Sequence, residues 1–317
     1  MIAYEEILLD CVNTDDRVVI MTAENRGHMR NLPPHLGDRF IDVGIAEMTM
    51  IGSAAGLAKR GRIVVTHALA SFITLRAFEF VRDDVGILGL PVIMVGMVPG
   101  FLSDGNGPTH QAIEDVALMR GIPNVGVYCP SDEDDMRIGL KHIILSGKPF
   151  YVRYNPLPSI IEHDQTFVIG QAETVIQPPA GSNDVTILTY GMMLRQCVEA
   201  ARELQQDGVG VKVVNMRTLD PIDNAALLDA VRSSALVVTV EDHLKTGGLY
   251  SILCETMVKH RVMAPVLPIA LDGRWFKPGR LHEVLETEGF TSQHIVVRIR
   301  TALDNTARKL HVDSTIG

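Results

Sequence analysis

The sequence predicts an α/β protein of two domains, each built on a mostly parallel sheet with helices on both faces. Its 317 residues correspond to two domains at the usual size of roughly 150 residues each. Short β-rich runs alternate with longer stretches of helical period, which is the pattern of a parallel sheet covered on both sides. A Pro- and Gly-rich stretch at residues 155–184 interrupts this alternation and marks a boundary between the domains.

The first half of the chain carries the first alternation. We expect its strands at residues 17–23, 40–43, 62–66, 91–97, 126–128 and 150–154. Helical periodicity between the strands indicates helices at residues 4–12, 46–59, 72–83, 113–120 and 134–145. Together these elements predict a first domain over residues 1–160.

A linker over residues 161–184 joins this domain to a second one over residues 185–317. The linker contains two strand-like pieces, at 167–169 and 174–176. In the second domain we expect strands at residues 185–189, 211–215, 236–241 and 266–271. We expect its helices at residues 194–206, 224–231, 249–259 and 281–286.

Composition narrows the class of protein. The net charge of −9 argues against a nucleic-acid backbone or an anionic membrane surface as the main partner. Hydrophobic residues make up 46% of the chain and aromatic ones only 5%, so the core must be aliphatic. The apolar excess has two explanations, a well-filled interior or large surfaces buried against another chain. The longest apolar stretch, residues 85–98, is broken by glycines and a proline, so no segment is expected to span a membrane.

The cysteines and the first residues both favour a cytoplasmic protein. The four cysteines are scattered without metal-ligand spacing, which predicts packed thiols in a reducing compartment. Glu5, Glu6 and Asp10 stand where a signal peptide would carry basic residues and then an apolar run.

An acidic cluster at residues 132–135 has two interpretations. It follows Pro130 and Ser131 and opens a predicted helix, where acids cap free N–H groups and complement the helix dipole. A metal site is the alternative, but no partner ligands lie at useful spacing. We therefore favour capping.

Two segments remain as candidates for chemistry, because phosphate-loop and familiar nucleophile motifs are absent. The first reads D-R-F-I-D-V-G-I-A-E-M over residues 38–48, so that Glu47 follows a strand and a glycine and opens an Ala- and Gly-rich helix. A carboxylate there lies at the carboxyl end of a parallel strand, where open α/β sheets bind ligands. The alternative is an acid that only decorates the first helical turn.

The second segment, S-D-G-N-G-P-T-H-Q-A-I-E-D at residues 103–115, is a Gly-rich loop after the strand at 91–97. It carries His110 into a following helix. Loops at strand carboxyl ends are usual places for a site, although a lone histidine can equally cap a helix in a solvated loop.

These motifs resemble a known family. G-I-A-E with A-A-G-L-A, G-P-T-H-Q, N-M-R-T-L-D-P-I-D and V-E-D-H-L-K-T-G-G-L are similar to the C-terminal half of transketolase. The closer likeness is to the separate C-terminal subunit of split transketolases, and it extends over residues 4–289. The resemblance implies a thiamine diphosphate pyrimidine-binding domain followed by a transketolase C-terminal domain, with the cofactor bound across an interface between two chains.

The resemblance also assigns the cofactor-binding residues. Glu47 matches the glutamate that donates a hydrogen bond to a ring nitrogen of the aminopyrimidine and so favours its imino tautomer. We expect an apolar pocket to raise the pKa of Glu47 for this task. Phe72 matches the aromatic residue that stacks on the pyrimidine, with plain core packing as the alternative. Leu69 stands where the family carries a second aromatic residue, and Ile45 lies beside Glu47.

Substrate contacts follow from the same resemblance. His110 matches a histidine near the substrate carbonyl and hydroxyls, for proton transfer or polar stabilisation. Arg153 matches a position that contacts a substrate phosphate, with a surface strand arginine as the alternative. His67, at the end of a strand, and His28, after the first strand, are further candidates for the substrate pocket.

Three positions depart from sugar-phosphate transketolases. Asn106 replaces an aspartate that senses a substrate hydroxyl, Val98 replaces a phosphate-contacting histidine, and Met48 follows the glutamate where Gln or His is common. We therefore expect an acceptor that is non-phosphorylated or has a different α-substituent.

The chain lacks the G-D-G…N motif that holds the diphosphate and its metal. We therefore expect a partner subunit that carries this motif and supplies the ligands of Mg²⁺ or Ca²⁺, in an α2β2 heterotetramer. The predicted reaction is transfer of a two-carbon ketol unit from a ketose to an aldehyde.

Other functions stay open within and beyond this class. The first is thiamine-dependent decarboxylation of a 2-oxo acid with acyl or ketol transfer, as in 1-deoxyxylulose-5-phosphate synthase or dehydrogenase β subunits. The second is a non-catalytic scaffold subunit that has kept the fold. The glycines of E-D-H-L-K-T-G-G, residues 241–248, resemble an anion-binding turn, although the family's C-terminal domain is mainly structural.

Overall fold

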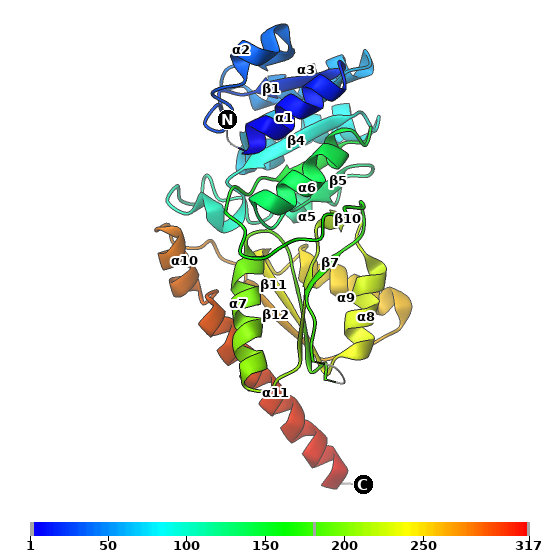
Figure 1. Ribbon diagram of the computed structural model, residues 1–317, viewed down its shortest axis with the longest axis vertical. Helices are drawn as coiled ribbons and strands as arrows, with labels where there is room; N and C mark the ends of the chain where they lie inside the picture. Colours follow the sequence, from blue (N-terminus) through cyan, green and yellow to red (C-terminus); the bar gives the residue numbers. More distant parts are fainter. Residues whose placement is uncertain (1–2, 180–181, 316–317) are drawn as a thin grey trace.

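The computed structural model describes residues 3–179 and 182–315, with the side chains of the last helix described as far as Asn305. Two sheets, of seven and five strands, lie one above the other along the long axis of the molecule (Figure 1). Helices cover both faces of each sheet. The structure thus confirms the predicted fold class of two α/β domains.

The N-terminal sheet has the strand order β10-β5-β6-β4-β3-β1-β2. Its parallel strands are β1 (Val18–Thr22), β2 (Phe40–Asp42), β3 (Ile63–Leu69), β4 (Val92–Met97), β5 (Gly126–Tyr128) and β6 (Phe150–Arg153). The seventh strand, β10 (Thr218–Asp220), comes from the second half of the chain and pairs antiparallel with β5. The edge of the first sheet is therefore completed by the second half.

Helices pack on this sheet according to their apolar faces. One face carries α1 (Ala3–Thr14) and α6 (Glu133–Ile144). The other face carries α3 (Glu47–Lys59), η2 (Phe72–Arg76), α4 (Phe78–Phe80), η3 (Val81–Gly86) and α5 (Asp115–Met119). Three short helices lie in the loops: α2 (Pro33–Leu36), η1 (Gly37–Arg39) and η4 (Gly100–Ser103).

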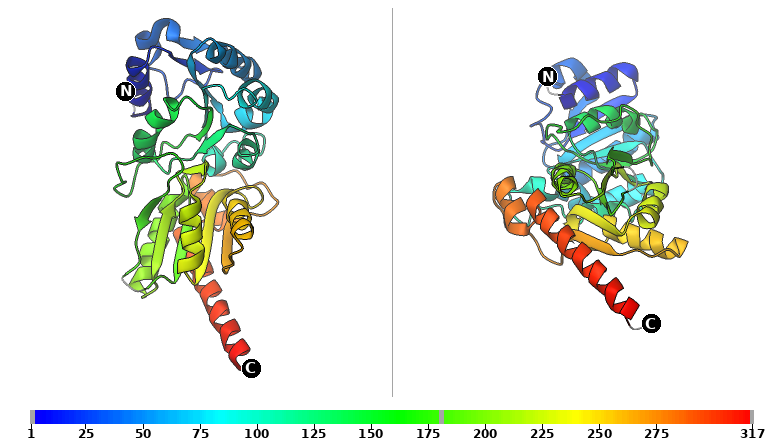
Figure 2. Two further views of the ribbon diagram at one scale, coloured as in Figure 1. Left: turned by 90° about the vertical axis from the view of Figure 1, so that its right-hand side faces the viewer. Right: turned by 60° about the horizontal axis from the view of Figure 1, so that its bottom comes forward.

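The C-terminal sheet has the order β12-β11-β8-β9-β7. It consists of β7 (Glu173–Ile176), β8 (Val185–Thr189), β9 (Val211–Asn215), β11 (Leu236–Leu244) and β12 (Val266–Leu271), with β7 antiparallel to β9. One face packs against α7 (Met193–Gln206), α10 (Leu281–Glu288) and α11 (Ser292–Thr315), and the other against α8 (Asn224–Ser233) and α9 (Leu249–His260). The end of α11 extends away from the body of the domain (Figure 2).

One hydrophobic cluster spans both domains. Side chains beneath α3 and α5 belong to the same buried cluster as side chains beneath α8 and α9. The second half of the chain also packs on the loop after β4, since Phe101 lies in the C-terminal core against Phe276 and Phe290, with ring centroids 5.1 and 4.9 Å apart. The domains are therefore joined by buried surface as well as by the linker.

Some local expectations need correction. The strand-like piece at 167–169 is not a strand, whereas the piece at 174–176 is most of β7. The helix expected at 72–83 is a series of short segments with two π-type turns, η2 and η3. Strand β10 and helix α11 were not expected.

The remaining general expectations can be checked directly. The four cysteines are free, and their thiols are packed as predicted: Cys11, Cys129, Cys197 and Cys254. Three of the four are buried and Cys254 is half-buried. In the described part of the chain, no helix is both long enough and apolar enough to cross a membrane.

Candidate active site

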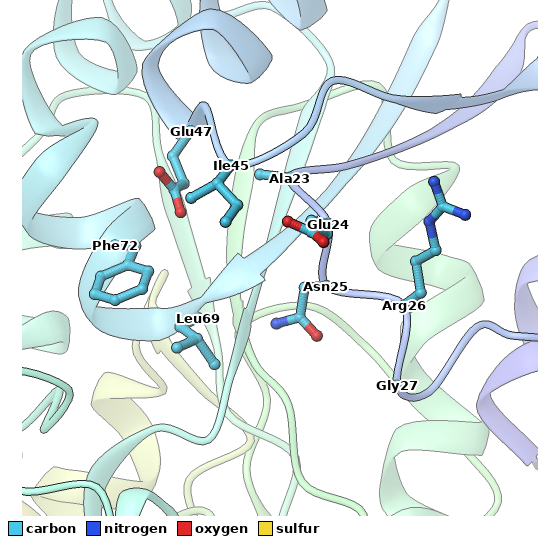
Figure 3. Close-up of a pocket in the computed structure, with 9 residues that line it drawn as sticks. All are labelled: Ala23, Glu24, Asn25, Arg26, Gly27, Ile45, Glu47, Leu69 and Phe72. Atoms are coloured by element: carbon cyan, nitrogen blue, oxygen red, sulfur yellow. The ribbon is translucent and has the colours of Figure 1, made fainter.

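A cavity of about 340 Å³ opens where β1, β2 and β3 end at the carboxyl edge of the N-terminal sheet (Figure 3). The segments that follow these strands supply its walls. Its lining residues are Ala23, Glu24, Asn25, Arg26, Gly27, Ile45, Glu47, Leu69 and Phe72. The structure therefore brings together the four residues that the sequence predicted for the cofactor.

Glu47 is the first residue of α3 and is only 3% exposed. The turn before it is held by Asp42, whose Oδ1 accepts hydrogen bonds from the N–H groups of Gly44 at 2.8 Å and Glu24 at 3.1 Å. Gly44 has φ +72°, a left-handed conformation that favours glycine. The loops after β1 and β2 are thus fastened together, and they aim Glu47 into the cavity (Figure 3).

An arginine links Glu47 to the predicted stacking residue. Arg76 Nη1 donates to Glu47 Oε2 at 2.8 Å, and the Arg76 Cζ lies 4.0 Å from the centroid of the Phe72 ring. The Phe72 ring also contacts the ring of His110: the two ring centroids lie 5.2 Å apart, with an angle of 57° between the ring planes. Glu47, Phe72 and His110 therefore form one contiguous site, although they are far apart in the sequence.

The contacts of Arg76 test whether this site fits an aminopyrimidine. A flat guanidinium lies over an aromatic ring and donates a hydrogen bond to a buried carboxylate. A flat nitrogen heterocycle bound at this position requires the same two interactions, stacking and a hydrogen bond to a carboxyl group. The residues present fit the pyrimidine half of thiamine diphosphate.

The remaining cofactor and loop residues lie at the rim. Ile45 is 74% exposed, and Leu69, at the end of β3, is half-buried. Asn106 is exposed in the Gly-rich loop, and His110 is half-buried, with Nδ1 2.9 Å from the Thr109 hydroxyl. The rim therefore combines apolar side chains, Ile45 and Leu69, with the polar segment Glu24–Gly27.

The Gly-rich loop is anchored to the C-terminal domain. Gln111 Nε2 donates to the Phe276 carbonyl at 2.9 Å, and the Gly279 N–H donates to the Asp104 carbonyl at 3.1 Å. The ends of the loop pack in the C-terminal core, through Phe101 and Ile113. The position of His110 therefore depends on both domains.

Two predicted histidines do not line the cavity. His67 is fully buried in β3, bonds to Tyr4 and has Nδ1 3.1 Å from the Met21 carbonyl oxygen. Burial lowers the pKa of His67 to about 4. His28 is half-buried one residue beyond Gly27, and its Nδ1 lies 3.0 Å from the Tyr154 hydroxyl. His67 is thus part of the core, whereas His28 follows Gly27, which lines the cavity.

Arg153, expected at a substrate phosphate, is instead buried between the domains. Its Nε donates to Asp115 Oδ2 at 2.8 Å, and its Nη1 donates to Asp242 Oδ1 at 2.7 Å. Although burial opposes its charge, these two carboxylates raise the pKa of Arg153 well above the ordinary value. Gly100 has φ +55°, and a Cβ there would lie 1.8 Å from Asp242 Oδ2. The ion pairs fill this interface and leave Arg153 no access to a ligand.

The acidic cluster at 132–135 caps α6, as predicted. Asp132 accepts hydrogen bonds from the N–H groups of Asp134 and Asp135, each at 3.0 Å. Among the described residues, the one group of three side chains with metal-like spacing is Asp135, His163 and Glu173. Arg217 already occupies that position, since its Nε lies 2.8 Å from Asp135 Oδ1. This group is a buried ion network between the linker and both domains.

The segment 241–248 is also occupied by its own side chains. Glu241 accepts hydrogen bonds from the N–H groups of Leu249 at 2.7 Å and Tyr250 at 3.0 Å, so it caps α9. A Cβ at Gly248 would lie 2.1 Å from Glu241 Oε2. An internal carboxylate therefore takes the place that an external anion would need.

Three further residues belong to the site without a sequence motif that marks them: Glu24 and Asn25 line the cavity, and Arg76 contacts Glu47. A four-residue spacing on a helix, as between Phe72 and Arg76, is the signal that could have identified the arginine, because such residues lie on one face. Glu24 has φ +60°, a conformation set by the turn after β1. The sequence around Glu24 does not predict this conformation.

Comparison with known proteins agrees with this geometry. Residues 2–156 match the family described as "Transketolase, pyrimidine binding domain", and residues 173–295 match "Transketolase, C-terminal domain". A 6-deoxy-6-sulfo-D-fructose transketolase subunit of Clostridium sp. (strain MSTE9) is 34% identical over 96% of this chain and 94% of the relative. A subunit of the apulose-4-phosphate transketolase of Phocaeicola vulgatus is 28% identical over 95% of this chain and 96% of the relative.

A solved structure shows the same arrangement of domains. It is described as a split gene transketolase, inactive beta4 tetramer, and it superposes with a TM-score of 0.86. It is 30% identical, and the match covers 95% of this chain and 97% of that one. With both domain matches, a carboxylate and an aromatic ring at one cavity and a histidine against that ring, the chain belongs to the transketolase family.

Proposed function

We propose that this chain is the pyrimidine-binding subunit of a two-component, thiamine diphosphate-dependent transketolase. The observation that carries the proposal is that Glu47 and Phe72 line one cavity and that His110 lies against Phe72 beside it. Nearly full-length matches to subunits of split transketolases support it. The reaction is transfer of a two-carbon ketol unit from a ketose to an aldehyde.

The residues of this chain then have distinct tasks. Thiamine diphosphate, when bound, supplies the stabilisation of a carbanion that amino-acid side chains lack. Glu47 holds a hydrogen bond to the ring nitrogen of the aminopyrimidine, and Phe72, Leu69 and Ile45 pack against the ring. His110 donates or accepts a proton at the oxygen atoms of the substrate.

A partner subunit supplies the other half of the site. The exposed rim around Glu47, with Ile45 at 74% exposed, supports a second chain that covers the pyrimidine. Among the described residues, the one group of three side chains with metal-like spacing is already bonded to Arg217. We therefore assign the diphosphate and the Mg²⁺ or Ca²⁺ ligands to the partner, in an α2β2 heterotetramer. Four free thiols support a reducing compartment, the cytoplasm.

The substrate is a specialised sugar. The two relatives are named as subunits for 6-deoxy-6-sulfo-D-fructose and for apulose-4-phosphate. Here Val98 and Asn106 replace a histidine and an aspartate expected in sugar-phosphate transketolases. Arg153 is bonded to Asp115 and Asp242, so a second expected phosphate contact, besides the histidine replaced by Val98, is missing. These changes support an acceptor without a phosphate, or one with a different α-substituent.

The function is tested by reconstitution with the partner that carries G-D-G…N. We expect thiamine-dependent ketol transfer that Glu47→Ala abolishes and that Glu47→Gln reduces by at least about a hundredfold, since a general acid–base group contributes about 10²–10⁴. Lys59→Ala, at the far end of α3, is the matched control and keeps full activity. Equal turnover with alanine at position 47 refutes the proposed mechanism.

Substrate class is tested separately on a panel of aldehydes. We expect ribose 5-phosphate to be a poorer acceptor, in kcat/KM, than non-phosphorylated aldehydes. The double variant Val98→His with Asn106→Asp should narrow this difference. Comparable activity on both classes in the original chain contradicts the assignment while leaving the reaction type intact.

A further inference from the structure

Arg76 lies where the proposed function needs the cofactor ring. In the structure, the Glu47 carboxylate and the Phe72 ring are both engaged by this one side chain. We propose that Arg76 is a displaceable occupant of the pyrimidine site, which holds Glu47 and Phe72 in the cofactor-free chain and leaves when the aminopyrimidine binds. This inference rests on the proposed function of the site.

First, the buried carboxylate of Glu47 needs an ion-pair partner. Glu47 is 3% exposed, and a carboxylate at that depth is costly unless it is paired. Among the described residues, Arg76 is the ion-pair partner of Glu47, with Nη1 2.8 Å from Oε2. The cofactor-free chain therefore needs this counter-ion, or another hydrogen-bond donor, at Glu47.

The second argument is the chemical likeness between the two occupants. A guanidinium is a flat N–C–N group with N–H donors, and it stacks on aromatic faces. An aminopyrimidine is also flat, contains an N–C–N unit, and stacks in the same way. With the Arg76 Cζ 4.0 Å from the Phe72 centroid, the arginine covers a face of that ring. A pyrimidine cannot use the same ring face and the same carboxylate oxygen while Arg76 stays there.

The third argument is that Arg76 is free to leave. Its side chain is 42% exposed, whereas that of Glu47 is 3% exposed, so solvent reaches the guanidinium and not the carboxylate. Arg76 ends the π-type segment η2, which Phe72 begins, so the two side chains are presented by a single irregular turn. Movement of Arg76 therefore requires a change of side-chain rotamer and no unfolding.

The test uses direct binding rather than turnover. The full chain is titrated with 4-amino-5-hydroxymethyl-2-methylpyrimidine, the ring fragment of the cofactor, in calorimetry and in ligand-detected NMR. Arg76→Gln keeps a long polar side chain but removes the charge. We expect the fragment to bind Arg76→Gln about fivefold or more tightly than the original chain, because a competing ion pair and cation–π contact have been removed. Glu47→Gln should lose this gain.

Arg82→Gln is the matched control. Arg82 lies six residues further along, is exposed, and forms an ion pair with Asp83, so its removal should leave fragment binding unchanged. Weaker binding to Arg76→Gln shows that Arg76 is a permanent part of the site and overturns the inference. Equal binding, or no binding to either form, shows that removal of Arg76 opens no site and also overturns it.

The outcomes separate this inference from the function on which it rests. If the reconstituted enzyme shows Glu47-dependent ketol transfer but Arg76→Gln binds the fragment no better, the function stands and the inference fails. If ketol transfer itself is absent, the proposed function fails whatever Arg76 does. Thermal unfolding of each variant, followed by circular dichroism, checks that the exposed substitutions leave the fold intact.

Discussion

Two arginines of this chain bind carboxylates in opposite settings. Arg153, between the domains, contacts Asp115 and Asp242, and the three side chains are 3%, 0% and 1% exposed. Arg76, at the cavity, contacts one carboxylate among the described residues, that of Glu47, and its side chain is 42% exposed. The first arrangement is closed and doubly paired, which suits a permanent joint. The second is open and singly paired, which suits a site that another group is to enter.

The comparison also explains how the two regions cooperate. The Gly-rich loop that carries His110 starts at the joint, because the Phe101 N–H donates to Asp242 Oδ2 at 3.3 Å. Its middle part carries His110, which lies against Phe72 beside the open site, before the chain returns to the joint at Asp115. A closed interface thus positions the loop that carries the proposed catalytic histidine.

The largest effect on stability is expected from a substitution that breaks the buried ion pairs of Arg153. Asp242→Ala leaves Arg153 with one of its two carboxylates and removes an acceptor from the Phe101 N–H. We expect the free energy of unfolding to fall by about 3–5 kcal/mol, because a buried ion is left partly uncompensated. Urea denaturation measures this loss. As a control, Lys245→Ala removes an exposed ion pair to Asp272 and should cost far less; equal losses contradict the contrast.

A pH profile sharpens the comparison through the other buried ion network. Although burial opposes the charge, hydrogen bonds to Asp132 and Glu173 raise the pKa of His163 to about 10. The unfolded value is near 6.5, so the stabilisation is complete below about pH 6.5 and is lost as the pH rises toward about 10. We expect a decrease of up to about 5 kcal/mol across this window, since each pKa unit corresponds to about 1.4 kcal/mol, measured by urea denaturation at each pH.

His163→Gln provides the control for that profile. Glutamine keeps a hydrogen-bonding side chain but does not titrate between these pH values. Its variant should show a flatter dependence over the same range. An unchanged slope assigns the dependence to groups other than His163.

A smaller effect is expected from the loss of one of the neutral hydrogen bonds that hold the Gly-rich loop. Gln111→Leu removes the donor to the buried Phe276 carbonyl, at a cost of about 1–2 kcal/mol. In the reconstituted enzyme the KM for ketose and aldehyde should rise, because the loop that carries His110 is less well held, while thiamine diphosphate affinity stays constant. Gln205→Leu, which loses similar bonds to carbonyls remote from the loop, should leave KM unchanged. Parallel changes in KM and cofactor affinity argue against a specific role for the loop anchor.

How far the sequence predicted these regions depends on the range of the interactions. Glu47 could be placed because a strand, a glycine and a helix follow one another within a few residues, and that order sets the carboxyl edge of a parallel sheet. The partners of Arg153 could not be found in this way, since Asp115 and Asp242 lie 38 and 89 residues away. The expectation of a phosphate contact at Arg153 therefore rests on the family resemblance alone, with a surface strand arginine as its alternative.

The unexpected elements have similar causes. Strand β10 pairs with β5 across the domain boundary, so no local pattern announces it. The segment at 72–83 has the apolar content of a helix, but its π-type turns shift the side chains away from a 3.6-residue period. Phe72 and Arg76 nevertheless keep a four-residue spacing within η2, and both contact the open site.

Cofactor binding by the separated and combined subunits tests the central claim most directly. Calorimetry with thiamine diphosphate and Mg²⁺ is carried out on this chain alone, on the partner alone and on their mixture. The account predicts tight binding in the mixture only, with one cofactor for each copy of this chain, because Glu47 and Phe72 hold the pyrimidine here and the metal ligands lie in the partner. Binding to this chain alone that is as tight as binding to the mixture contradicts it.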